Sequence, residues 1–578
     1  MHIVVGRSGG VILITELDAT GSPATPTFEL PAVNFAQYVR ARESASPRWV
    51  WDDTAAWYPE LLRAGIRVER CHDLRLSHVI LCNSAFTAES PLSQSGPHRW
   101  DEAAVAHVPA VPTGDTLFDF AAEPDTSSAD ADGDADSTDS RVEFQRQQQA
   151  LLSSAETGRL RLLLAAESAG ALIAAEMQFA GLPWRTDIHD ALLTSELGPR
   201  VAYGTRPAKL EALAARIRSL LDNPTLNPDS QTEVLRALKR AGLPVRSTRA
   251  WELKEHSHPA LVPLLEYKKL SRLLSANGWY WMDTWIVNGR FHPDYVPGGV
   301  VTGRWATKGG GALQLPKQVR RAVTADDGWT FVVADASQLE PRILAALSTD
   351  LAMADAGRGT DLYAGIVASG VVETRDHAKV AMLGAMYGAT SGESGRLLPK
   401  LARAYPRALE LTEAAARVGE RGGVVTTRLG RSSPRPSEDW LRAQAYAYAP
   451  EASSADERMA RSQAREWGRF TRNFVVQGSA AEWALCWMAQ IRKALQKLDA
   501  GGAGGADRDP SQSPFSQSPH LVFFLHDEVV VHTPAALAPQ VQQIIVDAAT
   551  EAGRLLFGEF PVDFLLTVAT VESYADAK

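Results

Sequence analysis

The sixteen residues FVVADASQLEPRILAA, from Phe331 to Ala346, decide the fold of this chain. They open with an apolar, β-branched run that predicts a buried strand, and the strand ends at Asp335. Ala336-Ser337-Gln338 predicts a turn, and a helical pattern begins at Leu339. A carboxylate at the end of a buried strand suits a metal ligand, although an Asp that merely starts a turn produces the same pattern.

A second β-rich segment, LVFFLHDEVVVH from Leu521 to His532, follows about 190 residues further along the chain. Two apolar runs flank His526-Asp527-Glu528, and this pattern predicts a β-hairpin with adjacent carboxylates at its tip.

The segment ETRDHAKVAMLGAMYGA lies between these two and has the pattern of a helix. Side chains four residues apart lie along one side of a helix, and here they are Arg375, Lys379, Leu383 and Tyr387. Two cations, an apolar side chain and an aromatic ring on one face suit a nucleoside triphosphate. A solvated stripe that grades into a core stripe would give the same spacing.

In order and spacing, these segments resemble the three polymerase motifs of family A DNA polymerases, the DNA polymerase I type. The matches are Asp335–Arg342 to DYSQIELR, Arg375, Lys379, Tyr387 and Gly388 to R-x3-K-x7-YG, and His526–Glu528 to HDE. Three shorter matches flank them: Thr302–Thr307 to TGRLSS, Leu313–Pro316 to LQNIP, and Arg469, Asn473, Gln477 and Gly478 to R-x3-N-x3-QG.

The resemblance implies an α/β RNase H-like domain followed by an α+β right-hand polymerase with an antiparallel palm sheet. We expect the 3′-5′ exonuclease-like domain at residues 1–155 and the polymerase at 156–578. Within the polymerase, the thumb is expected at about 175–290, the palm at about 291–350 and 470–578, and the fingers at about 351–469.

The implied reaction is template-directed addition of dNTPs to a primer 3′-hydroxyl with release of pyrophosphate. Asp335 and Asp527 would hold two metal ions, with Glu528 beside them, and Lys379 would protonate the leaving pyrophosphate. Mg²⁺ is the expected ion because it favours oxygen ligands and substrate phosphates. His526 is a positioning residue in this scheme, since magnesium sites rarely use imidazole.

The resemblance also assigns residues to the two substrates. Those expected at the nucleotide are Gln338, Glu340, Tyr363, Arg375, Lys379, Leu383 and Tyr387, with Glu340 as the gate that excludes a ribose 2′-hydroxyl. Those expected at primer-template DNA are Arg304, Gln314, Arg469, Asn473, Gln477 and His526.

Four positions depart from the family pattern. Ala336 replaces the usual Tyr beside the catalytic Asp, and Pro341 stands where Leu is typical. Leu383 takes the place of an aromatic residue, and Tyr363 that of a phosphate-binding His. Each could alter nucleotide affinity or sugar discrimination, and none removes a metal ligand.

The exonuclease motifs are degraded. The first, Asp-x-Glu, aligns with Ile14–Glu16 and lacks one acid, and the third, Tyr-x3-Asp, aligns with Phe144–Gln148 and lacks its acid. Asp52 and Asp73 could serve as the second motif, and Glu16 and Asp18 could substitute elsewhere. Two lost ligands should abolish tight metal binding, so we expect this domain to be inactive.

The net charge of −9 does not exclude DNA binding. Asp119–Asp139 holds eight acids and no base, so the rest of the chain is close to −1. The tract 119–140 is expected to be a disordered insert. Three scattered cysteines and the lack of a signal peptide or membrane span fit a reducing, intracellular setting. Together with the family resemblance, this leads us to expect a cytoplasmic, nucleoid-associated monomer. We also expect no 5′-nuclease domain.

Two alternative functions stay open at this point. A single-subunit RNA polymerase shares the three motifs, but Glu340 opposes it because those enzymes carry a small residue at the gate. A catalytically inactive DNA-binding accessory protein would not need Asp335, Asp527, Arg375 and Lys379.

Overall fold

The protein was examined as a computed structural model, and the part that it describes comprises residues 1–8, 10–18, 21–96, 98–101, 139–388, 392–501 and 513–577. The acidic tract expected to be disordered lies almost entirely outside these residues. No helix in the described part combines the length and the hydrophobicity that a bilayer crossing requires.

The N-terminal domain is built on a five-stranded sheet of order β3-β2-β1-β4-β5. Its strands are β1 (His2–Ser8), β2 (Val11–Leu17), β3 (Phe28–Pro31), β4 (Arg48–Trp51) and β5 (Arg70–Asp73). The first three are antiparallel, whereas β4 and β5 run parallel to β1. The accompanying helices are α1 (Phe35–Glu43), α2 (Thr54–Arg63), α3 (Leu74–Asn83), α4 (Pro91–Gln94) and α5 (Ser140–Ser153). This is the α/β domain that the sequence predicts.

Helix α6 (Thr157–Ala180) joins the N-terminal domain to the rest of the molecule. Most of its residues are buried, and it packs against α2, β5 and the long helix α20 (Ser454–Gly501). A buried ion pair crosses the same junction, with Arg492 Nη2 2.8 Å from Glu176 Oε1. The Tyr58 hydroxyl donates to the same oxygen at 2.6 Å, so side chains from both parts share one polar cluster.

The centre of the molecule is a four-stranded antiparallel sheet of order β12-β13-β11-β14. The strands are β11 (Trp329–Ala336), β12 (His520–Leu525), β13 (Glu528–Pro534) and β14 (Leu566–Val571). Helix α21 (Ala538–Phe557) packs against β11, β13 and β14, and α20 packs against α21. The predicted strand at Phe331 and the predicted hairpin therefore belong to one sheet.

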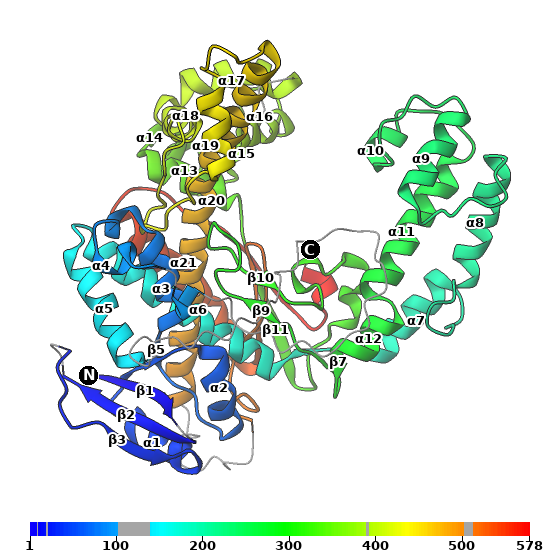
Figure 1. Ribbon diagram of the computed structural model, residues 1–578. Helices are drawn as coiled ribbons and strands as arrows, with labels where there is room; N and C mark the ends of the chain where they lie inside the picture. The colour runs from blue at the N-terminus through cyan, green and yellow to red at the C-terminus, as the bar shows by residue number, and fades with distance from the viewer. Residues whose placement is uncertain are drawn as a thin grey trace.

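Two helical arms rise on opposite sides of this sheet (Figure 1). The first comprises α7 (Thr186–Leu197), α8 (Ala208–Leu220), α9 (Gln231–Arg240), α10 (Ala250–Leu253), α11 (Leu261–Asn277) and α12 (Trp279–Trp285). The second comprises α13 (Leu339–Ser348), α14 (Leu351–Ala356), α15 (Leu362–Ala368), α16 (Arg375–Tyr387), α17 (Gly392–Ala404), α18 (Pro406–Glu420) and α19 (Glu438–Tyr446). We call them the thumb arm and the fingers arm, after the right-hand fold that they form with the palm sheet.

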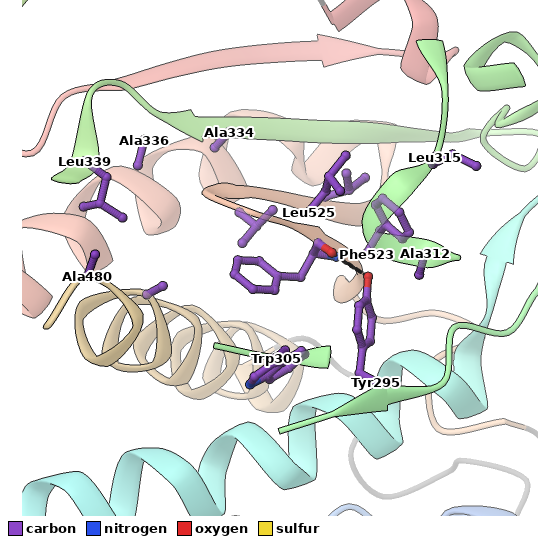
Figure 2. Close-up of a cluster of buried hydrophobic side chains, with 14 of the residues drawn as sticks. Tyr295, Trp305, Ala312, Leu315, Ala334, Ala336, Leu339, Ala480, Phe523 and Leu525 are labelled. Carbon is purple, nitrogen blue, oxygen red and sulfur yellow. Dashed lines mark hydrogen bonds between the residues drawn. The ribbon is translucent and has the colours of Figure 1, made fainter. Parts of the chain in front are cut away.

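Five short strands lie outside the palm sheet, and aromatic side chains beside them support the β12–β13 hairpin. The short strands are β6 (Leu182–Pro183), β7 (Ile286–Val287), β8 (Arg290–Phe291), β9 (Tyr295–Val296) and β10 (Ala306–Thr307). Trp305 and Tyr295 are buried between the hairpin and α6 (Figure 2). The Tyr295 hydroxyl donates to the Phe524 carbonyl at 2.6 Å and accepts from the Phe524 amide at 3.0 Å, which satisfies the buried phenol and fixes the hairpin.

Candidate active site

The register of β11 and β13 brings the two predicted aspartates together. Asp335 lies directly opposite Glu528, and residues opposite each other in an antiparallel pair have Cα atoms about 5 Å apart. The Ala336 amide also donates to the Asp527 carbonyl at 2.9 Å. Asp527 is therefore next to the end of β11, although 192 positions separate the aspartates in the sequence.

The hairpin tip carries one carboxylate rather than the two that its sequence predicts. Asp527 is in the turn, but Glu528 is the first residue of β13 and its side chain is only 2% exposed. The Tyr574 hydroxyl donates to Glu528, and Arg320 Nη1 is 3.7 Å from the same carboxylate oxygen. Glu528 is thus held by groups on the C-terminal segment and on the η6 turn (Lys317–Ala322), beside the aspartates rather than in the turn with them.

His526 has a left-handed backbone conformation with φ of 58°. It lines a cavity of about 50 Å³ between the hairpin and α20, together with Arg304 and Trp305. Burial and the nearby positive charge of Arg304 lower the pKa of His526 below its ordinary value. The imidazole is therefore neutral near pH 7 and adds no positive charge beside Asp527.

The two aspartates fit a divalent cation whose remaining ligands come from elsewhere. In the described residues no three His, Cys, Asp or Glu side chains form a metal-binding group. Asp335 and Asp527 alone supply carboxylate oxygens, the ligand type that Mg²⁺ prefers, and Mg²⁺ commonly completes its octahedral shell with water and substrate phosphates. This donor set suits a site that is completed by a bound nucleotide.

Helix α16 presents the predicted nucleotide face to solvent. Lys379 is exposed, and Leu383 and Tyr387 are 36% and 38% exposed. The buried residues of α16 lie on its other side and include Ala378, Ala381, Met382, Ala385 and Met386. The stripe is therefore not part of the core. The helix begins where the Thr374 hydroxyl accepts from the His377 amide at 3.1 Å, and it ends at Gly388, with φ of 74°.

Arg375 is the first residue of this stripe. Asp361 links it to Gln338, in the turn between β11 and α13. Arg375 Nη2 lies 2.8 Å from Asp361 Oδ2, and the Gln338 amide donates to the same oxygen at 3.0 Å. Burial favours the neutral acid, but the hydrogen bond and charge of Arg375 outweigh it and lower the pKa of Asp361. The Arg375 guanidinium also lies 5.4 Å from the ring centroid of Tyr363, whose pKa burial raises to about 12.

The expected gate residue Glu340 connects the two halves of the site. Tyr387 donates its hydroxyl to Glu340 Oε2 at 2.6 Å, and Arg304 forms an ion pair with the other oxygen. The Glu340 side chain is 12% exposed. Burial, reinforced by the hydrogen bond to Glu340, raises the pKa of Tyr387. The phenol is thus neutral and acts as a donor over the whole physiological range.

A left-handed residue and a buried arginine fix the shape of the turn between β11 and α13. Gln338 is left-handed, with φ of 52°, and the buried Arg342 holds the turn through its guanidinium. Arg342 donates to four carbonyls, those of Ser337, Gly357, Thr360 and Asp563, at 2.7–3.0 Å. Pro341 lies in the first turn of α13, where a backbone N–H would have no partner within the helix. The N–H that proline lacks is therefore not missed, and the helix tolerates this residue.

The predicted DNA contacts line the cleft side of α20 and the turns near it. Arg469 is exposed, and Asn473 and Gln477 follow it one and two turns along the helix with intermediate burial. A Cβ added at Gly388 would lie 2.9 Å from Arg469 Cγ, which places Arg469 at the inner end of α16. Gln314, in the turn at Ala312–Gln314, is exposed.

Sequence reasoning missed Asp361, Arg320 and Tyr574, which position the predicted residues. Asp361 carries a weak signal, because an Asp before an apolar run is a common N-cap, and it does cap α15 through the Ala364 amide at 2.8 Å. Arg320 and Tyr574 carry no local signal, since their contact with Glu528 arises only when distant segments pack together.

The N-terminal acids that could have replaced the missing exonuclease ligands do not gather at one place. Glu16 lies opposite Ile3, near the start of β1. Asp52 follows β4 and Asp73 ends β5, so both lie toward the other end of the strands. The cause is strand direction: β2 is antiparallel to β1, while β4 and β5 are parallel to it. Side chains at opposite ends of these strands are about 10 Å apart.

Each of these acids already has a structural role. Glu16 accepts from the Tyr38 hydroxyl at 2.7 Å and pairs with Arg42. Asp73 is buried and caps α3 through the Leu76 amide at 3.0 Å. Asp18 accepts from the Ser22 amide at 3.0 Å in the β2–β3 connection.

A family model for "DNA polymerase family A" matches residues 207–575. DNA polymerase I of Chloroflexus aurantiacus is 29% identical over 360 residues, which cover 57% of this chain and 34% of that protein. The thermostable DNA polymerase I of Thermus filiformis is 24% identical over 382 residues, covering 61% of this chain and 39% of that protein. The chain thus spans well under half the length of these curated relatives.

A solved structure shares the fold over the whole chain. It is the POL domain of Pol1 from M. smegmatis in complex with DNA primer-template and dNTP. The TM-score is 0.67 at 16% sequence identity, and the match covers all of this chain and 95% of that one. With the family model matching more than half of the sequence, these findings establish that the chain belongs to DNA polymerase family A.

Proposed function

We propose that this chain adds dNTPs to the 3′-hydroxyl of a DNA primer under the direction of a template strand, with release of pyrophosphate. The observation that carries the proposal is the meeting of Asp335 and Asp527 at one end of the palm sheet, beside Glu340 and its partner Tyr387 on α16. Carboxylates, a gate and a cationic face are the parts that nucleotidyl transfer requires.

In the proposed reaction Asp335 and Asp527 hold two Mg²⁺ ions. When bound, the ions would activate the primer hydroxyl and neutralise charge on the phosphates. Arg375 and Lys379 would bind the triphosphate, and Lys379 is exposed and able to give its proton to the leaving pyrophosphate. Arg375 would exchange its contact with Asp361 for the phosphates or use that contact to hold its orientation.

Glu340 would select the sugar. Its carboxylate is fixed by Tyr387 and Arg304, so it cannot move aside easily for a ribose 2′-hydroxyl. A single-subunit RNA polymerase would need room at this position, and the anchored carboxylate favours dNTPs instead. Leu383, Gln338 and Tyr363 complete the proposed nucleotide side, while Gln314, Asn473 and Gln477 are proposed to contact primer-template near the primer end.

Primer extension on a defined template tests this proposal. Extension with dNTPs, dependence on Mg²⁺ and loss of activity in Asp335→Asn and Asp527→Asn are the expected results. Preference for rNTPs would favour the RNA polymerase alternative. Unchanged primer-template binding combined with no extension under any nucleotide and metal condition would favour the inactive accessory protein.

We further propose that the N-terminal domain has no 3′-5′ exonuclease activity, because Glu16 and Asp52 lie toward opposite ends of the neighbouring strands and not at one shared site. An Asp335→Ala enzyme should therefore leave a 3′-labelled primer intact in Mg²⁺ or Mn²⁺. Degradation that disappears on adding Glu16→Ala would refute this. The domain limits, the monomeric state and a location at the cytoplasmic nucleoid also remain proposals.

A further inference from the structure

Helix α20 extends well beyond the residues proposed to contact the primer end. Asn473 and Gln477 lie near its middle, but the helix begins at Ser454. Moving from Arg469 toward the N-terminus, the next residues at spacings of three or four are Arg465, Arg461 and Arg458. The proposed DNA-binding stripe is thus continued by three arginines.

These side chains form one track rather than a ring around the helix. At about 100° per residue, Arg458, Arg465 and Arg469 lie within about 40° of one another, and Arg461 lies about 40° from Arg465. From Arg458 to Arg469 the helix rises about 16 Å, at about 1.5 Å per residue. A stacked nucleic acid strand rises about 3.4 Å per nucleotide along its axis, so the track matches the length of about five nucleotides.

The arginines of the track are available for an anionic ligand. All four are exposed, and within the described part of the chain no carboxylate lies in ion-pair distance of Arg458 or Arg465. Arg461 lies 3.3 Å from Glu457 and Arg469 lies 3.7 Å from Glu466. Such exposed pairs within one helix are weak because solvent screens them, so a phosphate can displace them.

The position of the track decides which strand it meets. The N-terminal end of α20 lies among the fingers helices, across the palm sheet from the thumb arm (Figure 1). New base pairs form at Asp335 and Asp527, so product duplex occupies the thumb side. On the fingers side the template has not yet been copied and its bases are unpaired. A cationic track here faces single-stranded template, not duplex.

Two exposed aromatic side chains stand at the outer end of the track. Tyr446 ends α19 and Tyr448 follows it, with exposures of 49% and 90%. The Gln444 side chain donates to the Ala460 carbonyl at 2.9 Å, which ties this end of α19 to the first turns of α20. A cationic groove with aromatic stacking platforms is the usual combination for binding single strands without sequence preference.

We propose that Arg458, Arg461 and Arg465 bind the phosphates of the unpaired template strand ahead of the active site, with Tyr446 and Tyr448 stacking on its bases. This inference rests on the proposed polymerase function, since it takes the direction of the template from it. It adds a binding surface whose contribution depends on the length of the template overhang.

The test compares primer-templates with the same duplex and template 5′ overhangs of one nucleotide or about ten nucleotides, which spans the site sizes of single-strand binders. Fluorescence anisotropy gives Kd at several salt concentrations for wild type and for the triple variant Arg458→Gln, Arg461→Gln, Arg465→Gln. Wild type should bind the long overhang more tightly, and the triple variant should lose that difference. Its salt slope on the long overhang should shrink by about 2, at about 0.7 per lost single-strand contact.

A matched control removes the same charge elsewhere: Arg358→Gln, Arg417→Gln and Arg554→Gln, three exposed arginines outside the track. It should keep the overhang difference, and both variants should extend the short-overhang template at the wild-type rate. A retained difference in the track variant, or equal loss on both substrates, would overturn the inference while leaving the polymerase proposal intact. Absence of extension by the wild type would instead refute the proposed function.

A separate binding measurement tests the role of the two tyrosines. Tyr446→Ala with Tyr448→Ala should weaken binding of the long overhang but leave the salt slope unchanged, because stacking releases no counterions. Unchanged affinity would remove the tyrosines from the proposed surface.

Discussion

Substitution of Tyr387 by Phe removes one hydroxyl and leaves the ring, and it should weaken discrimination against ribonucleotides. The hydroxyl donates at 2.6 Å to Glu340, whose side chain is 12% exposed. Hydrogen bonds to a charged group contribute about 1.5–3 kcal/mol. Because Tyr387 is 38% exposed, the lower end of that range, about 1.5 kcal/mol, is appropriate.

Loss of this hydrogen bond weakens the hold on the Glu340 carboxylate and does not affect the chemical step of nucleotide addition. With Tyr387→Phe, only Arg304 still anchors the carboxylate, so displacing it to admit a 2′-hydroxyl costs about 1.5 kcal/mol less. Since about 1.4 kcal/mol is a factor of ten in rate, the ratio of kcat/KM for dNTP to that for rNTP should fall about tenfold. The dNTP value itself should change little, because a deoxyribose does not require the carboxylate to move.

Single-nucleotide incorporation kinetics measure this ratio directly. The set comprises wild type, Tyr387→Phe, Glu340→Gln and the double variant, with Tyr405→Phe as a hydroxyl deletion elsewhere in the fingers arm, where the phenol lies 3.2 Å from the Ser369 hydroxyl. An unchanged ratio in Tyr387→Phe would refute the reasoning. So would full additivity in the double variant, because two groups that act through one hydrogen bond must show coupling.

Further predictions concern the metal ligands, a buried acid and a close helix contact. Asp335→Asn and Asp527→Asn should each reduce extension at least about a thousandfold, because a lost carboxylate removes several kcal/mol of charge stabilisation, while DNA affinity and Tm stay close to wild type. Burial raises the pKa of Glu482 to about 7 from its ordinary 4.5, so the folded chain retains a proton that the unfolded chain releases. The contribution of Glu482 to the free energy of unfolding should therefore fall by up to about 3 kcal/mol as the pH rises from 4.5 through 7. Because burial also raises the pKa of Asp73 to about 7, urea denaturation of Glu482→Gln across that range should show a smaller fall than the wild type. Gly478→Ala would place a Cβ 2.4 Å from Thr427 Cγ2, so denaturation should show a loss of about 1–3 kcal/mol, and unchanged stability would mean that this contact relaxes freely.

Local patterns were sufficient for the elements that carry the site. The β-branched run before Asp335, the hairpin around Asp527 and the four-residue spacing in α16 depend on neighbours in sequence, and the structure has each of them. The family resemblance then supplied the pairing of β11 with β13. Local propensity alone does not determine which strands pair or in which register.

The sequence left two features open, and strand direction or distant packing decides both. Glu528 is adjacent to Asp527 in sequence, but Tyr574, 46 residues away, fixes its buried position. Glu16 and Asp52 both lie where strands end, but antiparallel β2 and parallel β4 end toward opposite ends of β1. A sequence pattern shows that a strand ends in an acid and carries no information about the end of the neighbouring strand beside which that acid lies.

Two of the four departures from the family pattern, Tyr363 and Leu383, lie on α15 and α16, on the proposed nucleotide side of the site, and leave the carboxylate pair intact. Tyr363 places its ring beside the Arg375 guanidinium, at the position where the family has a phosphate-binding His. Asp361 forms an ion pair with the same guanidinium. The metal ligands depend on the register of β11 and β13, which side-chain changes on α15 or α16 do not alter. In the proposed reaction, binding of the triphosphate by α15 and α16 and binding of the metal by β11 and the β12–β13 hairpin therefore depend on separate structural elements. This separation allows one to vary while the other is kept, and it predicts that restoring His at Tyr363 changes KM for the dNTP more than kcat.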